Sequence, residues 1–320
     1  MATVYHREQA GFPGYADGVD LPGFTALKTI LKACLVTGYG AKPAAGWELI
    51  SEGTYHIVLR NGSHTGYLSL TRPSFNHVCT VHVMETFTSH NGTMPAGSGL
   101  KTGIAANNAV PHKFQTYYLV YPPSGSVQGN SWFMVADNKT FNLCMLGGYT
   151  TPVDWSNGWD TLHLYVGEDS AGNFVAVGGE AATGDSPNSF FDERGMTALK
   201  NPATGLLVGT GSIAPYIFAP KFYGQSYERT VAAPPVDRLE VAKCRWGASG
   251  AYAGALRGCT LGVSLNGLTP NAACGLLGRE IYTYRNAQVP FPSTDGRSWY
   301  LAPASHRSAL AIVTDAPEFW

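Results

Sequence analysis

Charged residues are scarce in this sequence. Lys, Arg, Asp and Glu make up 13% of the 320 residues, against roughly a quarter in an average soluble protein. The 21 basic and 22 acidic residues nearly cancel, and neither sign forms a run. We therefore expect no nucleic-acid partner and no anionic membrane surface as a partner. A chain that hides much of its surface in a permanent assembly needs few charges, so the shortage favours a homo-oligomer over a free monomer.

Long apolar runs are missing as well. The first residues contain no apolar run, so the sequence predicts no secretory signal. No stretch approaches the roughly 18 apolar residues of a membrane-spanning helix, so we expect no membrane insertion. Synthesis in a cytoplasm without classical export is the corresponding expectation.

The standard catalytic and metal-binding motifs are absent too. The sequence has no G-x-S-x-G, no P-loop, no G-x-G-x-x-G after a strand and no H-E-x-x-H. Its six cysteines form no C-x-x-C pair and lie in apolar contexts, which predicts buried free thiols. His77, Cys79 and His82 are spaced like metal ligands, but on a strand His82 faces away from the other two. We predict no metal, no cofactor and no enzymatic activity.

One group of residues has the composition of a sugar-binding site. Asp154, Asp160, Glu168 and Asp169 cluster in sequence around Trp155 and Trp159, and carboxylates beside tryptophans are typical of carbohydrate contacts. Aspartates that form turns at strand ends give the same pattern and are far more common. Asp154, Trp155, Trp159 and Asp160 remain a candidate carbohydrate or receptor contact.

Glycine, proline and alternating apolar residues dominate the rest of the chain. The 38 glycines and 20 prolines separate short segments with the period of a strand. This pattern predicts an α+β fold of mainly antiparallel sheets, sandwich-like or barrel-like, with one N-terminal amphipathic helix. The expected strands are 47–53, 54–61, 66–72, 78–87, 114–123, 131–137, 140–148, 161–169, 173–180, 205–211, 215–224, 239–247, 259–267, 278–286, 297–303 and 309–315.

The expected organisation has three parts. Residues 1–23 carry many glycines and prolines, which predicts an extended arm without regular elements. A β-rich domain follows over 24–231, and a smaller β-rich lobe over 236–320 comes after a proline-rich break. Within the larger domain we expect a long loop over 88–111 and a short helix over 189–201.

The N-terminal helix is the strongest local signal. Thr25 is its expected N-cap, and an apolar stripe from Leu27 to Leu35 recurs at helical spacing. Gly38 stands where a left-handed C-terminal cap favours glycine. The helix is therefore expected to cover one face of the first sheet.

The segment that follows this helix carries a resemblance. The run LVTGYGAKPAAGW resembles a pattern recurrent in structural proteins of tailed-bacteriophage virions, with HIVLRNG (56–62) and the closing strands also similar. Thr37 stands where asparagine is common in that pattern. The matching residues are Leu35, Val36, Gly38, Tyr39, Gly40, Lys42, Pro43, Gly46 and Trp47.

The resemblance implies a virion component rather than a catalyst. Its expected place is the tail tip, the baseplate or another minor tail position, with tail-tube, tail-tip or baseplate subunits as partners. The expected localisation is the virion, after synthesis in the host bacterial cytoplasm. The alternatives are a capsid-associated or decoration protein, a receptor-binding or carbohydrate-binding module, and an enzyme with an unrecognised site.

Overall fold

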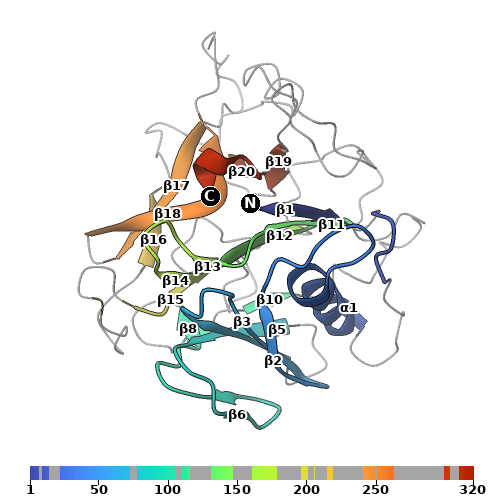
Figure 1. Cartoon of the computed structure of the whole chain (residues 1–320). Coiled ribbons are helices and arrows are strands. Elements are labelled where there is room, and N and C mark those ends of the chain that lie inside the picture. Colours follow the sequence, from blue (N-terminus) through green and yellow to red (C-terminus); the bar gives the residue numbers. More distant parts are fainter. Residues whose placement is uncertain are drawn as a thin grey trace, which may run out of the picture.

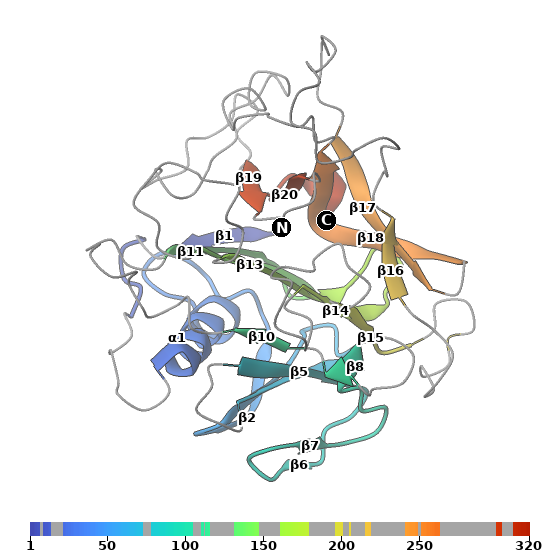
Figure 2. The same cartoon turned by 180° about the vertical axis from the view of Figure 1, so that it is seen from behind.

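The described part of the chain folds into antiparallel sheets and one α-helix, which lies close to the N-terminus. This confirms the fold class predicted from the sequence. In Figure 1 the sheets are stacked as layers, and Figure 2 shows the same stack from behind. The computed structural model describes residues 1–6, 9–13, 22–72, 78–104, 110–111, 113–115, 131–146, 161–178, 196–200, 205, 215–218, 241–248, 251–262, 299–302 and 310–320.

The central layer is a six-stranded sheet that is buried on both faces. Trp132 and Met134 point into a core shared with the second sheet, whereas Phe133 and Val135 point into a core shared with the third. Two-sided burial explains why these strands are apolar without alternation. In spatial order the strands are β1 (Thr3–His6), β11 (Ser131–Ala136), β12 (Thr140–Leu146), β13 (Thr161–Glu168), β14 (Phe174–Val177) and β15 (Met196–Ala198).

The second sheet lies below the central one in Figure 1 and packs only one face against it. Ile57 and Leu59 point into the shared core, so His56, Val58 and Arg60 lie on the outer face. In spatial order its strands are β10 (Lys113–Gln115), β5 (Val78–Met84), β4 (Tyr67–Thr71), β3 (His56–Arg60) and β2 (Glu48–Gly53).

The third sheet covers the opposite face of the central sheet. Trp246, Leu256 and Val313 pack against the central strands in a second apolar core. The C-terminal Trp320 packs against the same core and donates its indole N–H to the Thr314 carbonyl at 2.6 Å. In spatial order the strands are β16 (Pro215–Phe218), β17 (Val241–Ala248), β18 (Ala251–Gly262), β20 (Leu310–Thr314) and β19 (Trp299–Ala302), and the 3-10 turn η6 (Pro317–Phe319) follows β20.

The helix begins earlier than the sequence predicts. Helix α1 spans Pro22–Leu31 and continues as the π-helical turn η1 over Lys32–Thr37, so Thr25 lies inside the helix and the N-cap prediction was wrong. Proline fits this position because the first turn needs no N–H donor from it. The helix does end at Gly38, whose φ is 72°. Its apolar side chains enter the core between the central and second sheets.

Three other local expectations were wrong. Residues 1–23 do contain regular structure, because β1 pairs with β11 and α1 begins at Pro22. The helix predicted over 189–201 is contradicted by β15, where apolar burial against β14 overrides helix propensity. The long loop expected over 88–111 contains two short hairpins, β6 (Ser89–His90) with β7 (Pro95–Ala96) and β8 (Gly103–Ile104) with β9 (Val110–Pro111).

One strand pairing bears on the predicted division between the larger domain and the C-terminal lobe. The predicted break at 232–235 lies outside the described residues. Strand β16 precedes that break, yet it pairs with β17, which follows it. No helix in the described part of the chain is long and apolar enough to cross a membrane.

Candidate functional site

The segment that carries the sequence resemblance forms a compact loop, Gly38–Trp47, which we call the clasp. Its backbone returns to the end of the helix, where Ala45 N–H donates to the Cys34 carbonyl at 2.9 Å and Gly46 and Trp47 donate to the Leu35 carbonyl at 3.0 and 2.9 Å. These bonds satisfy carbonyl groups that a helix end otherwise leaves open. The clasp therefore acts as the C-terminal cap of the helix.

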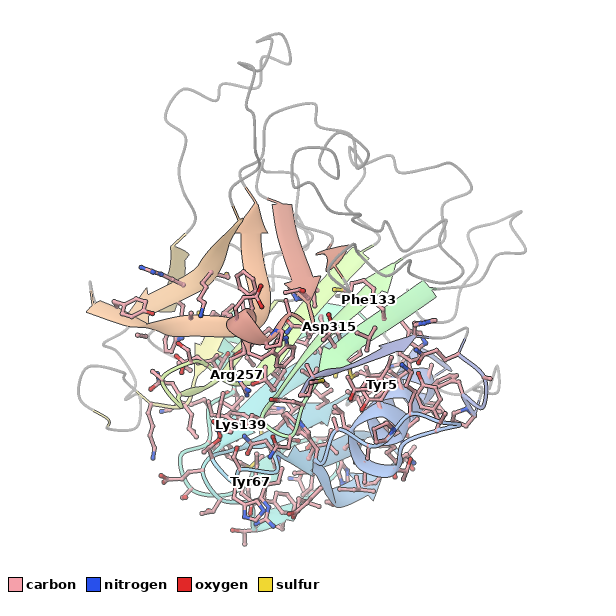
Figure 3. The ribbon with its side chains drawn as sticks, turned by 45° about the horizontal axis from the view of Figure 1, so that its top comes forward. Tyr5, Tyr67, Phe133, Lys139, Arg257 and Asp315 are labelled. Carbon is pink, nitrogen blue, oxygen red and sulfur yellow. The ribbon has the colours of Figure 1, made fainter. Side chains whose placement is uncertain are left out.

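Aromatic side chains fasten the N-terminal strand to the clasp. Tyr39 is buried, and its hydroxyl donates to Gln9 Oε1 at 2.7 Å. Tyr5, in β1, donates its own hydroxyl to the Pro43 carbonyl at 2.7 Å, and Phe12 packs edge-on against the Tyr39 ring. Figure 3 shows Tyr5 beside the helix. The clasp thus joins the first strand to the helix.

Gln9 also closes the outer edge of β1. Its side-chain amide donates to the Val4 carbonyl at 3.3 Å and accepts from the His6 N–H at 3.2 Å. The amide therefore takes the place of a neighbouring strand at these two groups. Covering an edge in this way discourages pairing with another chain.

Trp47 anchors the other end of the clasp in the central sheet. The side chain is 3% exposed and donates its indole N–H to the Asp137 carbonyl at 2.9 Å. Its ring contacts Phe141 edge-on, with 5.3 Å between centroids. Asp137 lies in the turn between β11 and β12, so the clasp also fixes that turn.

Two glycines of the clasp are required by space as well as by backbone conformation. Gly38 and Gly40 have φ values of 72° and 54°, which side chains rarely adopt. A Cβ on Gly38 would lie 2.5 Å from the Lys42 carbonyl oxygen, and one on Gly40 would lie 2.1 Å from that of Ala10. Among the resembling residues, Gly40, Pro43 and Gly46 are exposed, Val36, Gly38 and Lys42 are partly exposed, and Leu35, Tyr39 and Trp47 are buried.

A buried carboxylate joins the second sheet to the central one. Glu168 is 4% exposed, and its carboxylate accepts hydrogen bonds from the Ser63 and Thr65 hydroxyls and pairs with Lys139 at 3.1 Å. Burial alone would raise the pKa of Glu168, but these hydrogen bonds outweigh it and hold the pKa below its usual value. Figure 3 shows Lys139 between the two layers.

Further polar bonds join the central sheet to the third. Arg257 pairs with Asp137 at 2.6 Å, and the Trp246 indole N–H donates to Asp169 Oδ2 at 2.6 Å. Asp169 is 2% exposed, and burial raises its pKa. A Cβ on Gly254 would lie 2.0 Å from Asp169 Oδ2, so this carboxylate needs a glycine opposite it. Both clusters are satisfied internally and serve to hold the layers in register.

A third polar cluster lies on the outer face of the second sheet. His56 Nε2 is 3.0 Å from Ser51 Oγ, and the His56 ring stacks on His90 with 3.8 Å between centroids. A serine next to a histidine is the first requirement of a nucleophilic site, but the neighbouring Glu52 is engaged by Lys28 and Lys32. Within the part of the chain that the structure describes, no carboxylate bonds to His56 to complete a triad.

The residues proposed from sequence as a carbohydrate contact cannot be placed. Asp154, Trp155, Trp159 and Asp160 lie outside the described residues, so that site stays a prediction. His77 lies outside them as well.

The remaining sequence-predicted positions are described. Cys79 is in the core and His82 lies on the opposite face, opposite Ser69, as the strand pattern predicts. The described residues contain no group of three His, Cys, Asp or Glu side chains that could hold a metal ion. The cysteines described are buried and free, as expected: Cys34, Cys79, Cys144, Cys244 and Cys259.

Sequence reasoning missed the contacts that cross between layers. Gln9 and His90 carry no local pattern, because their partners lie on other segments. Glu168, which the sequence groups with the candidate carbohydrate contact, instead accepts hydrogen bonds from Ser63 and Thr65 between two layers. The one available signal was the presence of polar residues within apolar strands and turns.

No family model, curated protein or solved structure matches this chain.

Proposed function

We propose that this protein is a structural component of a tailed-bacteriophage virion that acts through protein–protein assembly at the tail tip or baseplate, or as another minor tail protein. The observation that carries the proposal is the clasp. The segment with the resemblance to virion proteins is the one that joins the helix, the first strand and the central sheet. If structural proteins share this sequence pattern, we expect the pattern to stabilise their fold, and the clasp has that role in this chain.

The connections between the layers support a mechanical role. Hydroxyl hydrogen bonds from Ser63 and Thr65 to Glu168 link the second sheet to the central one. The Arg257–Asp137 ion pair and the Trp246 indole bond to Asp169 link the third sheet to it. Glu168 and Asp169 are 4% and 2% exposed. Fully satisfied buried polar networks fix a single arrangement of the elements they join. A subunit of a particle benefits from this property, since its neighbours dock on a surface of fixed shape.

The composition supports an assembled state. With 13% charged residues, the chain has little of the surface charge that keeps isolated proteins apart. Interfaces of permanent assemblies are large and resemble a protein core, burying on the order of 2,000 Å² or more. We therefore propose a homo-oligomer within the particle, with tail-tube, tail-tip or baseplate subunits as its neighbours.

The test is to locate the chain in purified particles. Virions from cells that carry this gene are purified, heads and tails are separated, and each fraction is measured by quantitative mass spectrometry. The proposal expects the chain in intact virions and enriched in tails. Enrichment in heads would favour the capsid-associated or decoration alternative, and absence from virions would contradict a structural role altogether.

A matched pair of variants links the clasp to assembly. Gly40→Ala should deplete the chain from particles, because its Cβ would meet the Ala10 carbonyl oxygen. Gly92→Ala should be incorporated normally, because no atom lies within 4 Å of its Cβ. Normal incorporation of Gly40→Ala would show that the clasp is dispensable for assembly.

A further inference from the structure

Residues 85–101 form a flap on the outer face of the second sheet. The flap leaves the end of β5 as an extended hairpin, with the Thr88 N–H donating to the Ala96 carbonyl at 2.8 Å. At its base Phe87 stacks on Tyr67, with 6.5 Å between ring centroids. Figure 1 shows β6 of this hairpin as an outer layer below the second sheet. The flap therefore extends from one end of the sheet toward the other.

The far end of the flap is fastened by His90. Its ring stacks on His56 with 3.8 Å between centroids and 8° between planes, and its Nε2 is 3.1 Å from Thr71 Oγ1. His56 and Thr71 are paired residues of β3 and β4. One histidine of the flap thus holds two strands of the sheet.

The hydrogen bonds define the protonation state of His90. The Gly92 N–H donates to His90 Nδ1 at 2.9 Å, so this nitrogen carries no proton in the closed flap. Nε2 then carries the ring hydrogen and donates to the Thr71 hydroxyl. The closed arrangement requires a neutral His90.

The charged groups near the stack come from several elements. Lys28 of α1 disfavours a charge on His56, whereas Glu52 of β2 favours it. Lys28 and Glu52 also pair with each other at 3.4 Å, which weakens both influences. His82 of β5 lies on the same face, opposite Ser69. Among the described residues, Glu52 is the carboxylate that acts on the stack, and because Lys28 pairs with it, it offsets little of a second positive charge.

We propose that the His56–His90 stack is an acid-sensitive latch that holds the flap closed over the outer face of the second sheet. Protonation of His90 at Nδ1 converts the acceptor of the Gly92 N–H into a donor and breaks that bond. Protonation of both rings places two positive charges 3.8 Å apart. Both changes release the far end of the flap, while the base at Phe87 and the backbone ladder keep it attached.

The pH range of the latch follows from the pKa of His90 in the closed and open states of the flap. Burial, with a smaller effect of His56, lowers the pKa of His90 to about 4, and burial also lowers the pKa of His56. An open flap returns His90 to an ordinary value of about 6.5. Since the open state then binds more protons, closure is fully favoured above about pH 6.5 and is lost progressively as the pH falls toward 4.

The experiment measures amide hydrogen exchange of the full chain between pH 7 and pH 4, corrected for the intrinsic pH dependence of exchange. Protection of the amides at the far end of the flap, Gly92 and Asn91, is expected to fall at least about tenfold, whereas Thr88 in the backbone ladder should stay protected. Amides of the central sheet, such as Met134, should keep their protection over the same range. A histidine NMR titration should place the pKa of His90 well below 6.5.

The matched variant is His90→Asn. An asparagine Oδ1 can accept the Gly92 N–H as His90 Nδ1 does, but it cannot be protonated in this range. Its flap should therefore show the same protection at pH 7 and pH 4, and its central-sheet amides report whether it is folded. His64→Gln, on an exposed turn histidine that pairs with Glu48, should behave as wild type.

Three results would overturn the latch. The first is unchanged flap protection at pH 4 while the NMR titration shows His90 protonated. The second is an equal loss of protection in His90→Asn, which would assign the release to other groups. The third is a parallel loss in the central sheet, which would make the change global unfolding.

Discussion

The clasp and the flap are both connecting segments that lie against a sheet, yet they are fastened in different ways. The clasp is held by buried aromatic rings, glycines and backbone hydrogen bonds, none of which changes charge near neutral pH. The far end of the flap is held by two stacked histidines. A segment fixed by groups that do not titrate is constant, whereas one fixed by imidazoles depends on pH. The type of side chain that holds each segment therefore decides whether the segment stays in place at every pH or opens in acid.

The largest effect is expected where the clasp enters the core. Trp47→Ala removes a 3% exposed indole together with its bond to the Asp137 carbonyl. The free energy of unfolding should fall by about 3–5 kcal/mol in urea denaturation. Tyr55→Ala, at a side chain that is 41% exposed, should cost less than about 1 kcal/mol. Equal losses in the two variants would show that the clasp is no more important than surface packing.

Paired glycine substitutions compare the two segments directly. Gly40 in the clasp and Gly92 in the flap both have positive φ, 54° and 95°. Gly40→Ala should lower the free energy of unfolding by about 2–4 kcal/mol, because its Cβ would also meet the Ala10 carbonyl oxygen. Gly92→Ala should cost less, about 1–2 kcal/mol, because only the strain of its positive φ applies. A loss in Gly92→Ala as large as that in Gly40→Ala would contradict the difference between the two segments.

Acid should also act on the whole fold through a second histidine. His163 is 1% exposed, lies hydrogen-bonded to Asn142 at 3.0 Å, and burial lowers its pKa to about 3. The unfolded chain binds a proton near pH 6.5 and the folded chain does not, so stability is full above 6.5 and declines toward pH 3. By pH 4.5 the loss from this group should be about 2–3 kcal/mol.

The control for this effect is His163→Gln, which keeps a hydrogen-bond donor and cannot be protonated. Its free energy of unfolding should vary less than that of wild type over the same range. Identical pH profiles for the two proteins would assign acid sensitivity to other groups. Since His163 acts on global unfolding and His90 on local opening, chemical denaturation and hydrogen exchange separate them.

The smallest effect tests the polar part of the clasp. Tyr39→Phe removes the hydroxyl that donates to Gln9 Oε1 at 2.7 Å and leaves the buried ring in place. The free energy of unfolding should fall by about 1–2 kcal/mol in urea denaturation. Tyr67→Phe, whose hydroxyl is 3.4 Å from Arg60 Nη1 at the base of the flap, should be within about 0.5 kcal/mol of wild type. A reversal of this order would mean that the outer face contributes more than the clasp.

Most strands could be predicted from the sequence, because apolar periodicity and turn residues act locally. The turn at Asp137, which accepts the N–H groups of Lys139 and Thr140 at 2.9 Å each, follows directly from turn chemistry. Strand β15 could not be predicted, since its segment favours a helix and only pairing with β14 makes it extended. Strand β1 was missed because its partner β11 lies more than 120 residues away in sequence.

The residues of the clasp and the flap also differ in whether they could be recognised from the sequence. The glycines and Trp47 of the clasp could be recognised from sequence, because positive φ and burial restrict these positions to few residue types. The histidine stack could not, since His56 lies in β3 and His90 in the flap, 34 positions apart, with no repeat or spacing to connect them.

By itself, the sequence determined the antiparallel fold class, the amphipathic helix, the capping glycine at position 38 and the buried state of the described cysteines. These depend on periodicity and on steric limits within a few residues. Only the tertiary structure decided that the central sheet is covered on both faces, that Tyr39 and Trp47 join separate elements, and that the flap rests on a pair of imidazoles. Such features arise from contacts between strands distant in sequence, whose energies no local pattern records.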